Sequence, residues 1–160
     1  RVLPEADMTI KATGYQWYWG YEYPDHGGFG FDSLMLNDDE RGDQPRLLAT
    51  DTAMVVPVNT TVRVIVTAAD VMHSWAMPAF GVKMDAIPGR LNETWFKAEK
   101  TGTYYGQCSE LCGIRHAFMP IRVEVVEPEA FASWVVEAQA EYAQLETSKN
   151  MLADAGNLDK

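Results

Sequence analysis

Cysteine and histidine are scarce in this chain, which has two cysteines and three histidines among 160 residues. It also lacks any run of about 18 apolar residues, so we expect no segment of it to span a bilayer. Basic residues are few, with 13 Lys and Arg against 23 Asp and Glu and a net charge of −10. That balance argues against a nucleic-acid partner and favours a basic partner or solubility alone. The length suits one domain plus a tail, and no internal repeat is present.

The two cysteines lie in a short segment that also holds a histidine and a methionine: Cys108, Cys112, His116 and Met119. Thiolate, imidazole and thioether ligands together favour copper and electron transfer, because polarisable sulfur suits Cu(I) and imidazole also supports Cu(II). Zinc has little use for the methionine, and magnesium and calcium prefer oxygen ligands. A mononuclear blue-copper loop has one cysteine, whereas a second thiolate allows the pair to bridge two ions. The segment therefore predicts a dinuclear copper site.

Two interpretations of the cysteine pair involve no metal. A disulfide between Cys108 and Cys112 is open to a protein in an oxidising compartment, but it closes very little chain and adds little stability. A thiol redox enzyme usually places its cysteines in a Cys-x-x-Cys arrangement at the start of a helix, which this spacing does not match. The nearby histidine and methionine favour the metal site over both.

Short strand-like segments recur along the chain and indicate an all-β sandwich or barrel. They are residues 8–12, 16–23, 53–56, 61–67, 74–77, 93–97, 102–105 and 121–126. Residues 24–28 and 37–45 are rich in turn-forming residues and predict surface loops, with His26 solvated in the first of them. His73 follows the strand-like run 61–67, so it is expected where a strand ends and is the candidate for a further metal ligand.

The spacing of apolar residues becomes helical after Pro128. The residues at that spacing are Phe131, Trp134, Val135, Ala138, Tyr142 and Leu145. Proline suits the first turn of a helix, where its missing N–H is no loss. We therefore predict an amphipathic helix over residues 128–147 that packs on the barrel or on a neighbouring subunit. The polar, small residues of 148–160 predict a disordered tail.

Four blocks of sequence together resemble the water-soluble copper A domain of bacterial-type cytochrome c oxidase subunit II. They are Gly14–Tyr23, Asp70–Ala76, Lys83–Asn92, and Tyr104–Cys108 continuing through Met119–Ile121. The match covers most of residues 8 to 127 and departs at Tyr15, where many relatives carry a histidine. The resemblance implies an all-β, cupredoxin-like Greek-key barrel or sandwich with a C-terminal helix, the copper A domain being residues 1–127.

Carried over by position, the resemblance implies a complete set of metal ligands. Cys108 and Cys112 would bridge two coppers. His73 and Met119 would complete one copper, and His116 with the main-chain carbonyl of Glu110 the other. The side chain of Glu110 would bind magnesium or manganese only in the assembled complex.

The resemblance also implies a function and partners. The domain would accept electrons from cytochrome c and pass them to haem a of subunit I, which carries out oxygen reduction and proton pumping. Electrons would enter at Trp17, an aromatic residue near the copper. The acids expected to steer a basic cytochrome c are Glu22, Asp25, Asp51 and Asp70.

We expect the domain on the periplasmic side of the bacterial inner membrane, equivalent to the mitochondrial intermembrane side. Attachment would come through an N-terminal transmembrane hairpin that is missing from this sequence, as in an excised soluble fragment. Residues 83–92 are expected to face subunit I, although Asp85 and Arg90 are equally compatible with a local salt bridge.

Two other protein families share parts of this pattern. A nitrous oxide reductase shares the copper A loop, but it needs a large additional catalytic domain that this chain does not contain. A quinol oxidase subunit II uses the same barrel without copper and lacks the ligands that are present here. The blocks at residues 16–23 and 83–92 favour the cytochrome c oxidase.

Overall fold

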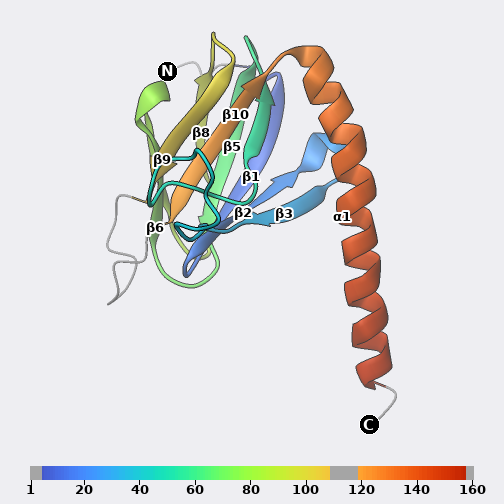
Figure 1. Cartoon of the computed structure of the whole chain (residues 1–160). Helices are drawn as coiled ribbons and strands as arrows, with labels where there is room; N and C mark the ends of the chain where they lie inside the picture. The colour runs from blue at the N-terminus through green and yellow to red at the C-terminus, as the bar shows by residue number, and fades with distance from the viewer. Residues whose placement is uncertain (1–4, 109–118, 158–160) are drawn as a thin grey trace.

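The computed structural model describes residues 5–108 and 119–157, with side chains as far as residue 143. Within those residues the elements are β1 Met8–Tyr15, β2 Tyr18–Tyr23, η1 Pro24–His26, β3 Phe29–Ser33, β4 Met54–Pro57, β5 Thr61–Ala68, β6 His73–Met77, η2 Pro78–Phe80, β7 Val82–Ala86, β8 Asn92–Lys97, β9 Gly102–Gln107, β10 Pro120–Val126 and α1 Pro128–Asn157. The described strands form one sheet of order β3-β2-β1-β5-β8, another of order β4-β10-β9, and the pair β6-β7. Figure 1 shows the strands gathered into one body with α1 along its side.

The core is built from strands whose apolar residues alternate with polar ones. In β5, Val62, Val64 and Val66 are fully buried, and in β10 Ile121 and Val123 are fully buried. Successive side chains of a strand point to opposite faces, so this alternation gives each sheet one face in the core. Burial of each such side chain contributes about 1.5–3 kcal/mol. The all-β architecture with a C-terminal helix that the sequence predicted is confirmed.

The pairing of β1 with β5 determines where distant segments meet. β1 runs antiparallel to β2, its hairpin neighbour, and parallel to β5. In this register Gly14 lies opposite Ala68, and the Ala69 amide donates a hydrogen bond to the Gly14 carbonyl at 2.9 Å. The turn that follows β1 is therefore fixed beside the segment that follows β5 and leads into His73.

Two strands were missed by the sequence prediction. β3 contains Gly30, a residue depleted in strands, where an added Cβ would lie 3.1 Å from the Tyr21 carbonyl oxygen of the adjacent strand. β7 contains Lys83 and Asp85, which also have low strand propensity. Each strand pairs with a stronger neighbour, β2 or β6, so tertiary pairing outweighs weak local preference.

The C-terminal helix is longer than the sequence predicted. It runs to Asn157 rather than ending at residue 147, so the prediction of a disordered tail from residue 148 was wrong over 148–157. That segment contains two alanines and one each of leucine, methionine and lysine, which favour helix continuation. Among the described residues, no helix combines the length and apolar character needed to cross a bilayer.

An aromatic cluster anchors the first half of α1. The Trp134 ring centroid lies 5.1 Å from that of Tyr23 and 5.6 Å from that of Phe29, and the Tyr142 ring lies 5.0 Å from that of Phe31. Tyr23 and the two phenylalanines come from the β2-β3 hairpin. The predicted amphipathic face of the helix thus packs on the sandwich edge.

The sequence suggested that His26 is solvated, but its side chain is half-buried beneath this helix. Its ring stands edge-on to Phe131, with centroids 5.4 Å apart, and to Tyr23 at 6.4 Å. Gln139 of α1 donates a hydrogen bond to the His26 carbonyl at 2.7 Å. A loop residue becomes part of the helix anchor because α1 covers the loop.

Candidate metal centre

Strand ends bring nitrogen and sulfur donors together at one end of the sandwich. His73 is the first residue of β6, not a residue after a strand as predicted, while Cys108 follows β9 and Met119 precedes β10. The Ser74 amide donates a hydrogen bond to Cys108 Sγ at 3.3 Å, and the Cys108 amide donates to the Met119 carbonyl at 3.2 Å. Figure 1 shows β6 beside β9 at this end. Three predicted ligands therefore lie in neighbouring backbone segments.

The other three predicted ligands, Glu110, Cys112 and His116, lie outside the described residues. Among the residues that are described, no group of three or more histidine, cysteine, aspartate and glutamate side chains is arranged to hold a metal. The fit of the site to copper is therefore tested on His73, Cys108 and Met119.

His73 has the hydrogen-bonding pattern of a metal ligand. The residue is fully buried, and Nε2 lies 2.8 Å from Asp70 Oδ1. The other ring nitrogen, Nδ1, is buried without a hydrogen-bond partner among the described residues. Such an unpaired buried nitrogen is costly, whereas a histidine that ligates a metal typically holds a carboxylate with its other nitrogen. The imidazole thus fits a soft or borderline metal at Nδ1.

Asp70 fixes the orientation of that imidazole and is itself fixed by backbone amides. Its carboxylate accepts hydrogen bonds from the Gln16 amide and the Val71 amide, both at 2.6 Å. Burial is the largest single influence and raises the pKa of Asp70, but the hydrogen bonds from Gln16, His73 and Val71 together hold that pKa below its ordinary value. The sequence analysis assigned Asp70 to docking and missed this contact, although the spacing of three residues before His73 was a signal for it.

The two sulfur residues differ in exposure and in chemical state. Met119 is buried, and Cys108 is half-buried. Cys108 is disulfide-bonded in the structure. Because the thiolate is the metal-binding form, Cys108 has to be reduced before it can bind copper. With that condition, the donor set of imidazole, thiolate and thioether suits copper.

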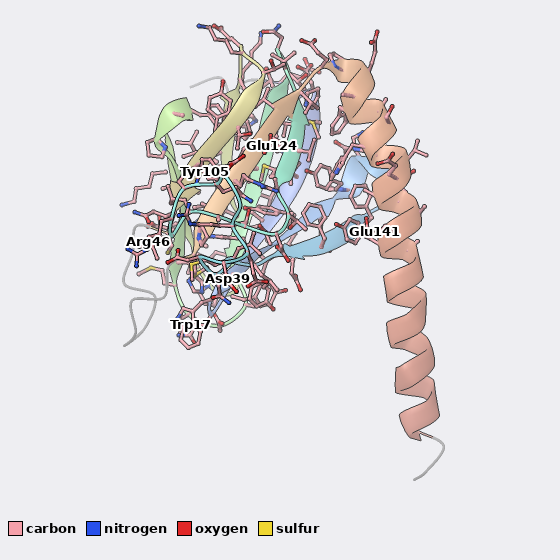
Figure 2. The ribbon with its side chains drawn as sticks, in the orientation of Figure 1. Trp17, Asp39, Arg46, Tyr105, Glu124 and Glu141 are labelled. Atoms are coloured by element: carbon pink, nitrogen blue, oxygen red, sulfur yellow. The ribbon has the colours of Figure 1, made fainter. Side chains whose placement is uncertain are left out.

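Trp17 occupies the turn between β1 and β2, close to the segment that holds His73. Its side chain is 42% exposed, and Figure 2 shows it at the tip of the hairpin, directed away from the sandwich. Trp19, Tyr21 and Tyr23 of the same segment are buried, whereas Trp17 lies outside strand β2. Part of the Trp17 side chain is therefore in contact with solvent.

The remaining predicted docking acids each have a local partner. Glu22 pairs with Lys11 at 3.8 Å. Asp25 accepts a hydrogen bond from the Thr9 amide at 2.8 Å, and Asp51 accepts one from the Leu34 amide at 2.7 Å. These contacts stabilise the fold without removing the negative charges, so docking stays a prediction.

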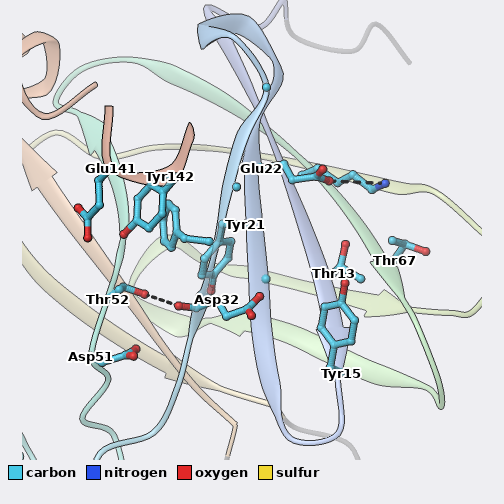
Figure 3. A pocket seen from close by; sticks show the side chains of 15 residues that line it. Thr13, Tyr15, Tyr21, Glu22, Asp32, Asp51, Thr52, Thr67, Glu141 and Tyr142 are labelled. Atoms are coloured by element: carbon cyan, nitrogen blue, oxygen red, sulfur yellow. Dashed lines mark hydrogen bonds and ion pairs between the residues drawn. The ribbon is translucent and has the colours of Figure 1, made fainter. Parts of the chain in front are cut away.

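Two of these acids line an open groove of about 730 Å³. Figure 3 shows Glu22 and Asp51 in it together with Asp32 and Glu141, which the sequence analysis did not single out. Glu141 comes from α1, so the helix adds a negative charge that local sequence around the strands does not reveal.

Comparison with known proteins gives a consistent result. A family model described as the periplasmic domain of cytochrome c oxidase subunit II matches residues 8–126. A probable cytochrome c oxidase subunit 2 of Rickettsia bellii is 56% identical over 92% of this chain and 55% of its own length. The subunit 2 of Cereibacter sphaeroides is 56% identical over 86% of this chain and 51% of its own length. The chain spans about half the length of these curated relatives.

Two solved structures share the fold. The periplasmic domain of subunit II of cytochrome oxidase from Bradyrhizobium japonicum is 66% identical, with a TM-score of 0.83 over 88% of this chain and 99% of that one. A mixed disulfide intermediate between a thioredoxin-like protein and subunit II of cytochrome c oxidase matches at 65% identity, with a TM-score of 0.78 over 88% of this chain and 96% of that one. The predicted cupredoxin-like fold is confirmed by this agreement.

Proposed function

The chain belongs to the cytochrome c oxidase subunit II family, and from that premise we propose that it holds a dinuclear copper A centre and transfers electrons. It accepts them from cytochrome c and passes them to haem a of subunit I, on the periplasmic side of the inner membrane. The oxidase activity of the complete complex is part of this proposal. The family match favours this role over the copper A domain of a nitrous oxide reductase.

The observation that carries the proposal is the environment of His73. A fully buried imidazole has one nitrogen held by Asp70 and the other without a partner among the described residues. Cys108 lies beside it, since its sulfur accepts the amide hydrogen bond of Ser74, the next residue after His73. The buried nitrogen, the aspartate on the other nitrogen and the adjacent sulfur together support a metal-binding role for His73.

The proposed ligand set follows the family pattern. His73 and Met119 belong to one copper, and Cys108 is shared between the two. The rest of the set, outside the described residues, is Cys112 as the second bridge and His116 with the Glu110 carbonyl on the other copper. The Glu110 side chain is proposed to bind magnesium or manganese in the complex.

Bound copper supplies a one-electron carrier whose charge is spread over two metal ions. The contribution of the protein is to hold the donors still, because any movement of ligands between oxidation states adds a barrier to transfer. His73 and Met119 are buried and adjoin paired strands. The Asp70 carboxylate keeps the His73 ring from rotating.

The proposed path for incoming electrons begins at Trp17. The neighbouring residue, Gln16, donates its amide hydrogen to Asp70, and Asp70 in turn holds the His73 ring. This connection of covalent and hydrogen bonds joins the exposed indole to a buried ligand. The net charge of −10 and the acids Glu22, Asp25, Asp51 and Asp70 suit a basic cytochrome c.

Reduction of Cys108 is proposed to precede copper binding. The sulfur is disulfide-bonded in the structure, and a disulfide has no thiolate to offer a metal. A relative that is 65% identical has been captured in a mixed disulfide with a thioredoxin-like protein. We expect a thioredoxin-like reductant to act on this chain in the same way.

Copper analysis of the purified chain tests the proposal. After reduction and loading, we expect two coppers per chain and a paramagnetic resonance spectrum with seven hyperfine lines, arising from one electron shared by two nuclei. The unreduced chain is the control and should take up less copper. A single ion per reduced chain, or a four-line spectrum, would contradict the proposal.

A further inference from the structure

The His73 ring packs against a residue without a side chain, Gly14. A Cβ added to Gly14 would lie 2.7 Å from His73 Cδ2, 3.0 Å from Cγ and 3.2 Å from Cβ. Real Cβ atoms essentially never approach another heavy atom closer than 3.0 Å. No residue other than glycine therefore fits at position 14 while the ring keeps its place.

The backbone at Gly14 is held in place by pairing with strands on both sides. The residue pairs with Trp19 of β2 on one side and with Ala68 of β5 on the other, and its carbonyl accepts the Ala69 amide. Its φ does not lie in the left-handed region, so backbone conformation does not explain the glycine. Glycine weakens a strand interior and often marks a close approach by another group, here the imidazole.

The same hairpin encloses the ring from other directions. Trp19, opposite Gly14 in the ladder, stands edge-on to His73 with ring centroids 6.1 Å apart. The turn residue Gln16 holds Asp70, which holds Nε2. The β1-β2 hairpin thus contacts the imidazole through Gly14 and Trp19 and fixes its carboxylate partner.

We infer that Gly14 is a positioning residue for His73: the missing side chain sets where the ring lies and hence where Nδ1 meets the metal. Gly14 touches no metal itself and acts only through the histidine. The inference rests on the proposed role of His73 as a copper ligand, but the contact it describes is a property of the metal-free chain.

A double-mutant cycle on the metal-free chain tests the contact. Gly14→Ala should lower the urea midpoint of unfolding by about 1 M, because the new methyl group collides with the ring. In a His73→Ala background the same change should cost much less. Equal losses in both backgrounds would overturn the inference. If Gly14→Ala does not fold, recovery of folding in the double variant supports it, and failure of both contradicts it.

Copper binding then separates positioning from simple destabilisation. In folded Gly14→Ala we expect copper affinity to fall about 10- to 100-fold and the hyperfine pattern to change. Gly20→Ala is the matched control, since its Cβ would meet Tyr15 and Asp32 side chains at 3.2 and 3.3 Å, not His73. A spectrum in Gly14→Ala identical to the parent's would overturn the inference. If the parent itself binds no copper, the proposed function fails while the double-mutant cycle still reports on the contact.

Discussion

The two described histidines of this chain, His73 and His26, share one unusual feature and differ in almost everything around it. In each, ring nitrogen Nδ1 is buried without a hydrogen-bond partner among the described residues. His73 has an aspartate on its other nitrogen and lies next to Cys108. His26 has aromatic rings around it, from Phe131 and Tyr23, and its backbone carbonyl accepts a hydrogen bond from Gln139.

The comparison shows that an unpaired buried nitrogen does not identify a metal site by itself. The surroundings decide, because a metal ligand needs further donors within reach and an anion that orients the ring. Around His73 the aspartate comes from the segment between β5 and β6, and the sulfur residues come from the segments beside β9 and β10. Around His26 the rings of Phe131 and Tyr23 and the side chain of Gln139 fasten α1 to the β2-β3 hairpin.

The largest expected effect is the loss of the paired copper spectrum in Cys108→Ser. A serine oxygen is a poor bridge between two soft metal ions, so the shared-electron state cannot form. Copper content and paramagnetic resonance are measured after reduction and loading. His26→Ala is the control and should keep two coppers. An unchanged spectrum in Cys108→Ser, or a lost one in His26→Ala, would remove the distinction between the two regions.

In the aromatic cluster beside His26, Trp134→Ala should reduce the free energy of unfolding by about 3 kcal/mol. This is the lower end of the range for removal of a large aromatic side chain, because Trp134 is only partly buried. The copper spectrum should not change, since α1 packs at the β2-β3 edge. Urea unfolding and the spectrum are measured together. Val136→Ala, on an exposed face of the same helix with 67% exposure, should cost little. Equal losses in the two variants would show that the aromatic cluster is not the anchor.

The strands were predictable from sequence where alternation was strong. Residues 61–67 were predicted as a strand, and β5 is Thr61–Ala68, because valines on one face leave little choice of register. β3 and β7 were missed because Gly30 and Asp85 have low strand propensity and the pairing partners decide. The extension of α1 to Asn157 was missed because a polar composition was taken for disorder despite good helix formers.

The site was predictable only as a set of ligand types. Cysteine, histidine and methionine spacing indicated copper, and His73 was selected as a ligand. The contacts that hold its ring were not visible, because Gln16 and Asp70 are 54 positions apart in the chain and meet only when β1 pairs with β5. Gly14 opens the block 14–23, but nothing in the sequence indicated its contact with His73, since a missing side chain has meaning only beside the group that fills its place.

A smaller effect is expected in Met119→Leu. Leucine has nearly the same volume as methionine, so the stability cost should stay below about 1.5 kcal/mol. The thioether is a weak ligand that tunes the copper more than it holds it, so two coppers should remain while the reduction potential shifts. Copper content and voltammetry decide the matter. Loss of one copper, or a potential equal to that of the parent, would show that this assignment is wrong.

The smallest expected effect belongs to the acidic groove. Glu22→Gln and Asp51→Asn should each slow association of the assembled oxidase with a basic cytochrome c by about two- to threefold at low ionic strength, because each removes one steering charge. The difference should disappear as salt rises, since exposed charges are screened beyond about 8–10 Å at physiological ionic strength.

The control variant is Glu99→Gln, which makes the same charge change in the turn between β8 and β9, at the end of the sandwich away from Trp17. An equal slowing in Glu99→Gln would assign the effect to net charge, and salt-independent rates would exclude electrostatic steering. Such results would leave the His73 region as the functional part of the comparison and the groove as ordinary surface.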